Sequence, residues 1–200
     1  MRETDQSSVV QVWSYEHVHG DNGNKRGPAA RANLQMVQVR RVRAGEGPQL
    51  RELRLRALRD TPHAFASSHR LEVAQPEAHW SELALASEKG QDAVVLVAMH
   101  DRRWIAMAAS RWFDQEAGIA QLWGMWVEPA ARGRGVGRTL VSAVASWAAA
   151  RGAAVLRLGV TDPAAEVASF YEQLGFRRTG ESRRLPPDGA VKAFFLVRSL

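Results

Sequence analysis

The chain has 200 residues, of which 46% are hydrophobic and 24% are charged, a composition typical of a globular protein with a substantial core. It contains no cysteine, which excludes disulfides, thiolate metal sites and a cysteine-linked acyl intermediate. The absence of any apolar run of about 18 residues excludes a transmembrane helix. The N-terminus also lacks the charge and apolar order of a secretory signal, so we expect a cytoplasmic protein.

The formal net charge of +6 comes almost wholly from arginine. Because these arginines are spread along the chain and are not interleaved with exposed aromatic residues, we expect no nucleic-acid partner. A basic nucleic-acid-binding protein stays a third hypothesis behind the two given below.

Residues 1–34 differ from the rest of the chain. The stretch 20–28 is rich in glycine, asparagine and charged residues, and it ends in proline, a composition typical of turns and linkers. We predict a poorly ordered N-terminal extension over residues 1–34 and one domain over residues 35–200.

From residue 36 onward, the apolar residues recur with clear strand or helix periods. Residues 36–43 alternate as a strand, and Leu50, Leu53, Leu55 and Leu58 mark a helix. A loop, with at most a turn of helix, follows at 61–68. The remaining elements are predicted as a helix at 76–88, strands at 93–99, 104–113 and 119–127, a helix at 135–150, a strand at 155–160, a helix at 163–174, and strands at 176–184 and 190–197.

This order predicts an α/β (α+β) fold with a mixed sheet. The strand at 119–127, the helix after it and the strand at 155–160 form a parallel crossover, which puts the intervening loop at the carboxyl end of a central strand. Strand alternation places Trp123 and Trp126 on opposite faces of the sheet.

That intervening loop, residues 132–138, has the features of an anion site, and we call it the anion loop. Glycines at 133, 135 and 137 let backbone N–H groups approach a ligand, and the next helix adds its unpaired N–H groups. Arg132, Arg134 and Arg138 add positive charge. The glycine spacing matches neither a Walker A loop nor a dinucleotide fingerprint.

What does match is Arg132-x-x-Gly135-x-Gly137, five residues after the valine of a Val127-x-Pro129 strand end. This motif resembles the acyl-CoA pyrophosphate loop of the GNAT superfamily of N-acyltransferases. Residues 170–176, Phe-Tyr-Glu-Gln-Leu-Gly-Phe, resemble the second signature of that superfamily. The resemblance extends over residues 36–197, and it implies a central mixed, mostly antiparallel sheet with a β-α-β CoA-binding core flanked by helices.

The resemblance also implies an enzyme that moves an acetyl group from acetyl-CoA to a primary amine, on a small molecule or a protein, by direct attack in a ternary complex. Tyr171 would protonate the leaving thiolate, although packing of its ring into the core is the alternative role. No metal is implied. The implied cofactor-binding residues are Met125, Trp126, Val127, Arg132, Gly133, Arg134, Gly135, Val136, Gly137 and Arg138.

Two positions depart from the family pattern. Ala164 stands where many members carry an asparagine, and the strand 119–127 contains no acidic residue to act as general base. Glu116 is our first candidate for the base, ahead of the three others, Glu128, Glu72 and His63. These departures keep open an alternative, a catalytically silent CoA-binding regulatory module.

Acceptor recognition is expected from residues 63–68 and from the turn at 185–189. The mixed sheet and its terminal strands also make a homodimer an expected form.

Overall fold

The computed structural model describes residues 37–161, 167–184 and 191–200. The predictions for residues 1–34, for Ala164 and for the turn at 185–189 lie outside these residues. The elements in chain order are β1 (Gln38–Arg41), α1 (Gly47–Asp60), η2 (Pro62–Ala64), α2 (His69–Val73), α3 (Glu77–Lys89), β2 (Ala93–His100), β3 (Arg103–Asp114), β4 (Ile119–Val127), η3 (Pro129–Ala131), α4 (Val136–Ala150), β5 (Val155–Thr161), α5 (Val167–Glu172), β6 (Arg177–Arg184) and β7 (Lys192–Ser199).

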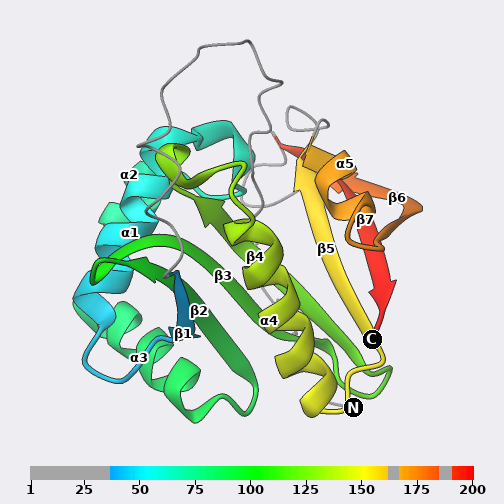
Figure 1. The fold of residues 1–200 in the computed structure, drawn as a ribbon, viewed down its shortest axis with the longest axis horizontal. Helices are drawn as coiled ribbons and strands as arrows, with labels where there is room; N and C mark the ends of the chain where they lie inside the picture. The colour runs from blue at the N-terminus through cyan, green and yellow to red at the C-terminus, as the bar shows by residue number, and fades with distance from the viewer. Residues whose placement is uncertain (1–36, 162–166, 185–190) are drawn as a thin grey trace, which may run out of the picture.

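The strands form one seven-stranded sheet in the order β1-β2-β3-β4-β5-β7-β6. All neighbouring strands are antiparallel except β4 and β5, so the predicted mixed, mostly antiparallel sheet is confirmed. Helices flank the sheet, with α4 packed along β2, β3 and β4 (Figure 1). In the described part of the chain, no helix is both long and apolar enough to cross a membrane.

The parallel strands β4 and β5 pair over only three positions, from Ile119 opposite Val155 to Gln121 opposite Arg157. Beyond these pairs the two strands separate toward their carboxyl ends, and α4 begins at that end of the sheet (Figure 1). The two strands are therefore paired at one end only, and we call the unpaired stretch between their carboxyl-terminal parts the β4–β5 gap.

A bulge in β4 corrects one prediction. Met107 of β3 lies opposite Trp126, whereas Ala109, two residues further along β3, lies opposite Trp123, three residues back along β4. The extra residue is accommodated at Gly124, whose φ of +65° suits glycine. Because directly opposed residues share a face, Trp123 and Trp126 lie on the same face, and the alternation predicted from sequence was wrong.

The helices differ from prediction in one further place. The short helix α2 was not predicted; it begins after Ser68, whose side chain accepts a hydrogen bond from the backbone N–H of Leu71 at 3.3 Å. Five residues are too few to show a helical apolar period, which explains the omission. The turn of helix expected within 61–68 is present as η2.

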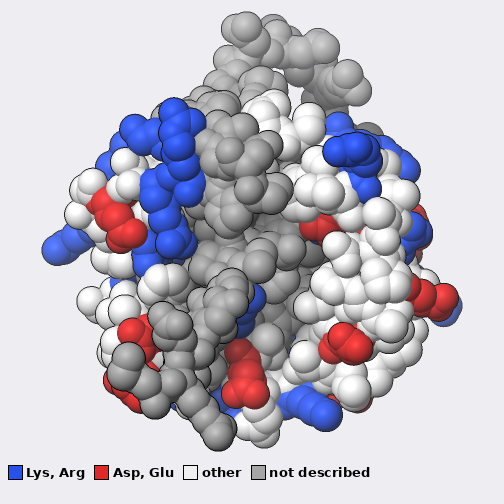
Figure 2. Space-filling view, turned by 180° about the vertical axis from the view of Figure 1, so that it is seen from behind, with Lys and Arg blue, Asp and Glu red and all other residues white. Residues whose placement is uncertain are grey.

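The fold also gathers charges that are dispersed in the sequence. The edge strand β6 carries four arginines, and its neighbour β7 adds Lys192 and Arg198. Figure 2 shows basic side chains along the flank of the molecule that these strands form. Charged side chains on an edge strand oppose pairing with another sheet edge, so this arrangement by itself indicates protection of the edge.

Candidate active site

The anion loop connects β4 to α4 through two glycines with positive φ. Gly133 and Gly135 have φ of +68° and +83°, and a Cβ at either position would meet no atom within 4 Å. Their requirement for glycine therefore comes from backbone conformation, and the space in front of the loop is open. Gly135 caps the 15-residue helix α4 without any side-chain hydrogen bond, which leaves the first N–H groups of the helix available to an anion.

The three arginines of the loop have different surroundings. Arg134 and Arg138 are exposed, as a phosphate contact requires. Arg132 has a side chain only 14% exposed, and its Nε donates to the carbonyl oxygen of Val127 at 2.8 Å. Its guanidinium also pairs with the carboxylate of Asp60 at the end of α1. Arg132 thus holds the loop against β4 and α1, and its predicted place near the phosphates stays a prediction.

Asp60 is a site residue that the sequence did not reveal. Its Oδ2 accepts a hydrogen bond from the indole Nε1 of Trp126 at 2.9 Å as well as the contact from Arg132. One carboxylate oxygen therefore ties together α1, the end of β4 and the anion loop. No local pattern marks this aspartate, because its arginine partner lies 72 residues away in sequence.

The backbone at the end of β4 faces the β4–β5 gap. Glu128 N–H donates to the Ile105 carbonyl at 2.8 Å, which fixes the side of β4 that is bonded to β3. In an antiparallel ladder the neighbouring residue points its N–H and C=O the other way, so those of Val127 face away from β3. The backbone N–H of Val127 is thereby presented to the gap.

Tyr171 lies on α5, beside the carboxyl-terminal part of β5 (Figure 1). The residue is fully buried, and its ring makes edge-on contacts with Phe170 and Phe176 at centroid distances of 5.1 and 5.8 Å. The ring thus contributes to the core as well as carrying a hydroxyl.

The sequence comparison identifies the family of this arrangement. The model of the acetyltransferase (GNAT) family matches residues 51–176, a span that includes the anion loop and Tyr171. The chain belongs to the GNAT acetyltransferase family. No curated protein is similar enough in sequence to count as a relative.

Solved structures of GNAT proteins share this fold. The PaiA N-acetyltransferase of Thermoplasma acidophilum, solved in complex with coenzyme A, is 15% identical with a TM-score of 0.65, and the match covers 83% of this chain and 100% of that one. The putative acetyltransferase yncA of Salmonella typhimurium, solved with acetyl-CoA, is 20% identical with a TM-score of 0.66, covering 83% and 95%. A GCN5-related N-acetyltransferase of Kribbella flavida is 23% identical with a TM-score of 0.64, covering 82% and 98%.

The structure does not bring Glu116, our first candidate for the general base, to the anion loop. Glu116 is exposed in the turn before β4, where the Gly118 carbonyl accepts from Ala154 N–H beyond the C-terminal end of α4. The nine residues of β4 separate this turn from the anion loop, and at about 3.3 Å per residue they span roughly 30 Å. That separation places Glu116 at the opposite end of β4 from the anion loop.

The three other candidate bases, Glu128, His63 and Glu72, lie in different parts of the fold. Glu128 forms ion pairs with Arg103 at 2.5 Å and with Arg56 at 3.9 Å. The backbone carbonyl of His63 accepts a hydrogen bond from Thr161 Oγ1 at 3.3 Å, which puts η2 next to the end of β5. Glu72 is buried and lines a cavity together with Met107 and Trp123.

Proposed function

We propose that this GNAT protein transfers an acetyl group from acetyl-CoA to a primary amine by direct attack of the amine in a ternary complex. The observation that carries the proposal is the junction of three features at one end of the sheet. These are the β4–β5 gap, the backbone N–H of Val127 facing it, and the open anion loop at the start of α4. The absence of cysteine favours direct attack over a cysteine-linked intermediate.

The residues present fit acetyl-CoA as the acyl donor. The backbone of Gly133, Gly135, Val136 and Gly137 would hold the pyrophosphate, with the exposed Arg134 and Arg138 adding charge. The backbone of residues 125–127 would pair with the narrow pantetheine arm in the gap. That a T. acidophilum and an S. typhimurium protein of the same fold were solved with coenzyme A and with acetyl-CoA supports this choice of donor.

The chain supplies the groups that acyl transfer needs. The N–H of Val127 would stabilise negative charge that develops on the acyl oxygen. Tyr171 would give a proton to the thiolate that leaves. We replace Glu116 by Glu72 as the proposed base, because Glu72 lies in a cavity next to the bulge at Gly124. Arg132 and Asp60 would act as positioning residues that hold the anion loop. A cytoplasmic location and a homodimer stay predictions.

Ligand-induced stabilisation tests donor binding. Saturating acetyl-CoA should raise the Tm, because a ligand that binds only the folded state stabilises it by mass action. Gly135→Glu should abolish the rise, since it puts bulk and negative charge in the loop. Gly45→Glu is the matched control, because Gly45 has φ of +84° and equally open surroundings but lies before α1. No rise in the wild type would overturn the proposal.

Turnover separates an enzyme from the alternative, a catalytically silent CoA-binding module. Thiol release from acetyl-CoA should be detectable with a panel of amines, and Tyr171→Phe, which keeps the ring contacts, should slow it by about tenfold or more. Stabilisation by acetyl-CoA without release for any amine would instead establish the silent module.

A further inference from the structure

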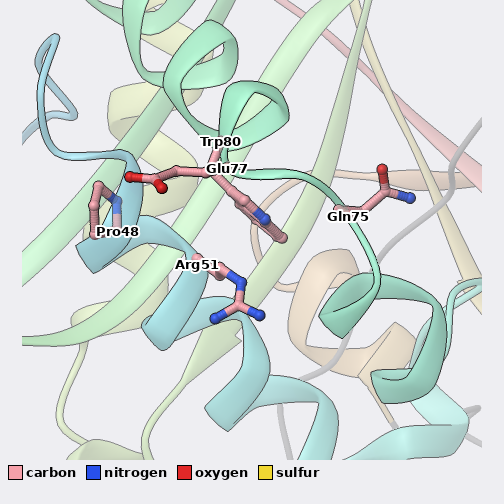
Figure 3. Close-up of a pocket in the computed structure, with 5 residues that line it drawn as sticks. All are labelled: Pro48, Arg51, Gln75, Glu77 and Trp80. Carbon is pink, nitrogen blue, oxygen red and sulfur yellow. The ribbon is translucent and has the colours of Figure 1, made fainter.

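A pocket of about 370 Å³ lies between the amino-terminal ends of α1 and α3. Its described lining consists of Pro48, Arg51, Gln75, Glu77 and Trp80. Figure 3 shows the indole of Trp80 extending from α3 toward α1, where Arg51 lies. Pro48 and Glu77 are exposed, so the pocket reaches the surface. None of these residues belongs to the anion loop or to the strands that flank the β4–β5 gap.

The two helices are in close contact at the border of this pocket. A Cβ on Gly47, the residue before Pro48, would lie 2.9 Å from the backbone nitrogen of Ser81 and 3.0 Å from the carbonyl carbon of Trp80. Such distances leave no room for a side chain, so the backbones of α1 and α3 meet directly there. The hollow beside this contact is therefore bounded by closely packed helices.

Two opposite charges line the pocket without pairing with each other. Neither Arg51 nor Glu77 forms an ion pair among the described residues. The guanidinium of Arg51 is held by a neutral group, because its Nη2 donates to the backbone carbonyl of Val73 at 3.1 Å. Glu77 is the first residue of α3, whose N-cap makes no side-chain hydrogen bond, so the helix dipole favours the ionised carboxylate. The described lining thus offers one positive and one negative group and has no net charge.

A buried donor adds to these polar groups. Trp80 is only 2% exposed, and its indole Nε1 has no hydrogen-bond partner among the described residues. Buried polar atoms are nearly always bonded in native proteins, so this N–H is suited to an acceptor oxygen of a ligand. The guanidinium of Arg51 also only donates, and its bond to Val73 uses one of its five N–H groups. Both side chains therefore select a ligand oxygen that accepts.

We propose that this pocket binds a free α-amino acid in its zwitterionic form. The carboxylate of the amino acid would accept hydrogen bonds from Arg51 and Trp80, and its ammonium group would donate to Glu77. A simple anion is a poor fit, because the carboxylate of Glu77 would repel it. A simple amine is a poor fit for the converse reason, because Arg51 would repel it. An α-amino acid carries both charges on one short segment and matches the neutral sum of the lining.

The pocket is separate from the site proposed for acetyl transfer. Arg51 and Asp60 are nine residues apart on α1, which corresponds to about 14 Å along the helix axis. Asp60 contacts the anion loop through Arg132, whereas Arg51 lies near the other end of the helix. The amino acid would therefore be an additional ligand, bound at the same time as acetyl-CoA, and not the amine that reacts with it.

Thermal unfolding and calorimetry test this binding without any turnover. The standard amino acids, each added singly at millimolar concentration, should include at least one that raises the Tm. The best of them is then compared with the amine that lacks its carboxylate and the acid that lacks its amine. Leucine, 3-methylbutylamine and 4-methylpentanoate are such a set. The amino acid should bind about tenfold or more tightly than either, since a charge-assisted hydrogen bond has roughly that effect.

Variants of the two charged residues locate the bound amino acid. Arg51→Gln and Glu77→Gln should each weaken its binding by about tenfold or more, because each removes one charged partner. Arg70→Gln on α2 and Glu88→Gln on α3 are the matched controls, because both residues are exposed and neither is among the described lining residues. These two variants should leave the affinity unchanged.

Coenzyme A tests the separation of the two sites, since it carries no acetyl group and permits no turnover. Saturating coenzyme A should leave the affinity for the amino acid unchanged. Displacement by coenzyme A, no rise in Tm with any amino acid, equal affinity for the amine or the acid, or unchanged binding in either pocket variant would overturn the inference. Because none of these measurements depends on thiol release, their failure is distinguishable from the failure of the proposed acetyl transfer.

Discussion

Asp60 holds the anion loop in place through one oxygen atom that accepts from both Trp126 and Arg132. Asp60→Asn keeps the shape of the side chain but removes its charge, so the guanidinium of Arg132 loses its partner. We expect the free energy of unfolding to fall by about 1–2 kcal/mol, because the pair is only partly exposed. The dissociation constant for acetyl-CoA should also rise, because the loop loses its support from α1.

Denaturant unfolding and calorimetry would measure the two effects. Glu172→Gln is the control, because Glu172 pairs with Arg178 at the surface, where such bonds contribute about 0–1 kcal/mol. If Asp60→Asn behaved like Glu172→Gln in both measurements, Asp60 would have no role in positioning the loop.

Among the elements, the bulge in β4 determines the shape of the site. Gly124→Ala would place a Cβ in ordinary contact with Met107, so its cost comes from the positive φ, at about 1 kcal/mol or more. Gly180→Ala is a matched control, because Gly180 also has a positive φ, of +81°, at a shift in strand register, here between β6 and β7. Both variants should lower the Tm, but only Gly124→Ala should weaken the acetyl-CoA-induced rise. If acetyl-CoA raised the Tm of both variants equally, the bulge would have no role in ligand binding.

The same bulge marks the limit of what the sequence predicts. The long elements carry a strong apolar period, so the strands, the helix α4 and the parallel pairing of β4 with β5 follow from the sequence. The faces of Trp123 and Trp126 do not follow, because period-two reasoning assumes an unbroken strand. A glycine inside an apolar strand is a known signal of a bulge, and Gly124 could have been interpreted that way.

The site residues also divide into those that local sequence predicts and those that depend on tertiary packing. The residues of the anion loop and Tyr171 are found from short motifs, which need only local sequence. The contact of Asp60 with Arg132 and the meeting of Arg54 with Glu72 depend on how α1, α2 and the sheet pack. Glu116 was chosen for being near β4 in sequence, and the length of that strand carries it to the wrong end of the sheet.

For the molecule as a whole, the sheet consists of two parts, β1–β4 and β5–β7–β6, which pair directly only at residues 119–121 and 155–157. Acetyl-CoA bound in the β4–β5 gap would contact both parts. We expect acetyl-CoA to slow backbone hydrogen exchange at residues 122–127 and 158–161, and to leave β1 and β2 nearly unchanged.

Hydrogen exchange followed by mass spectrometry would measure this difference, with Gly135→Glu as the control that should show no slowing. Uniform slowing over all strands would indicate global stabilisation instead of binding in the gap.

The short ladder between β4 and β5 gives the sheet an interior edge. Edge strands usually lie at the periphery, where they expose backbone groups to any passing chain. Among the described residues, no strand pairs with the side of residues 122–127 that faces β5, and the backbone N–H of Val127 lies on that side. In the proposed function, a thin, flexible molecule that carries its own amide groups would pair with this side of β4. The geometry of the backbone itself, before any side chain is considered, thus selects for a linear amide-containing ligand.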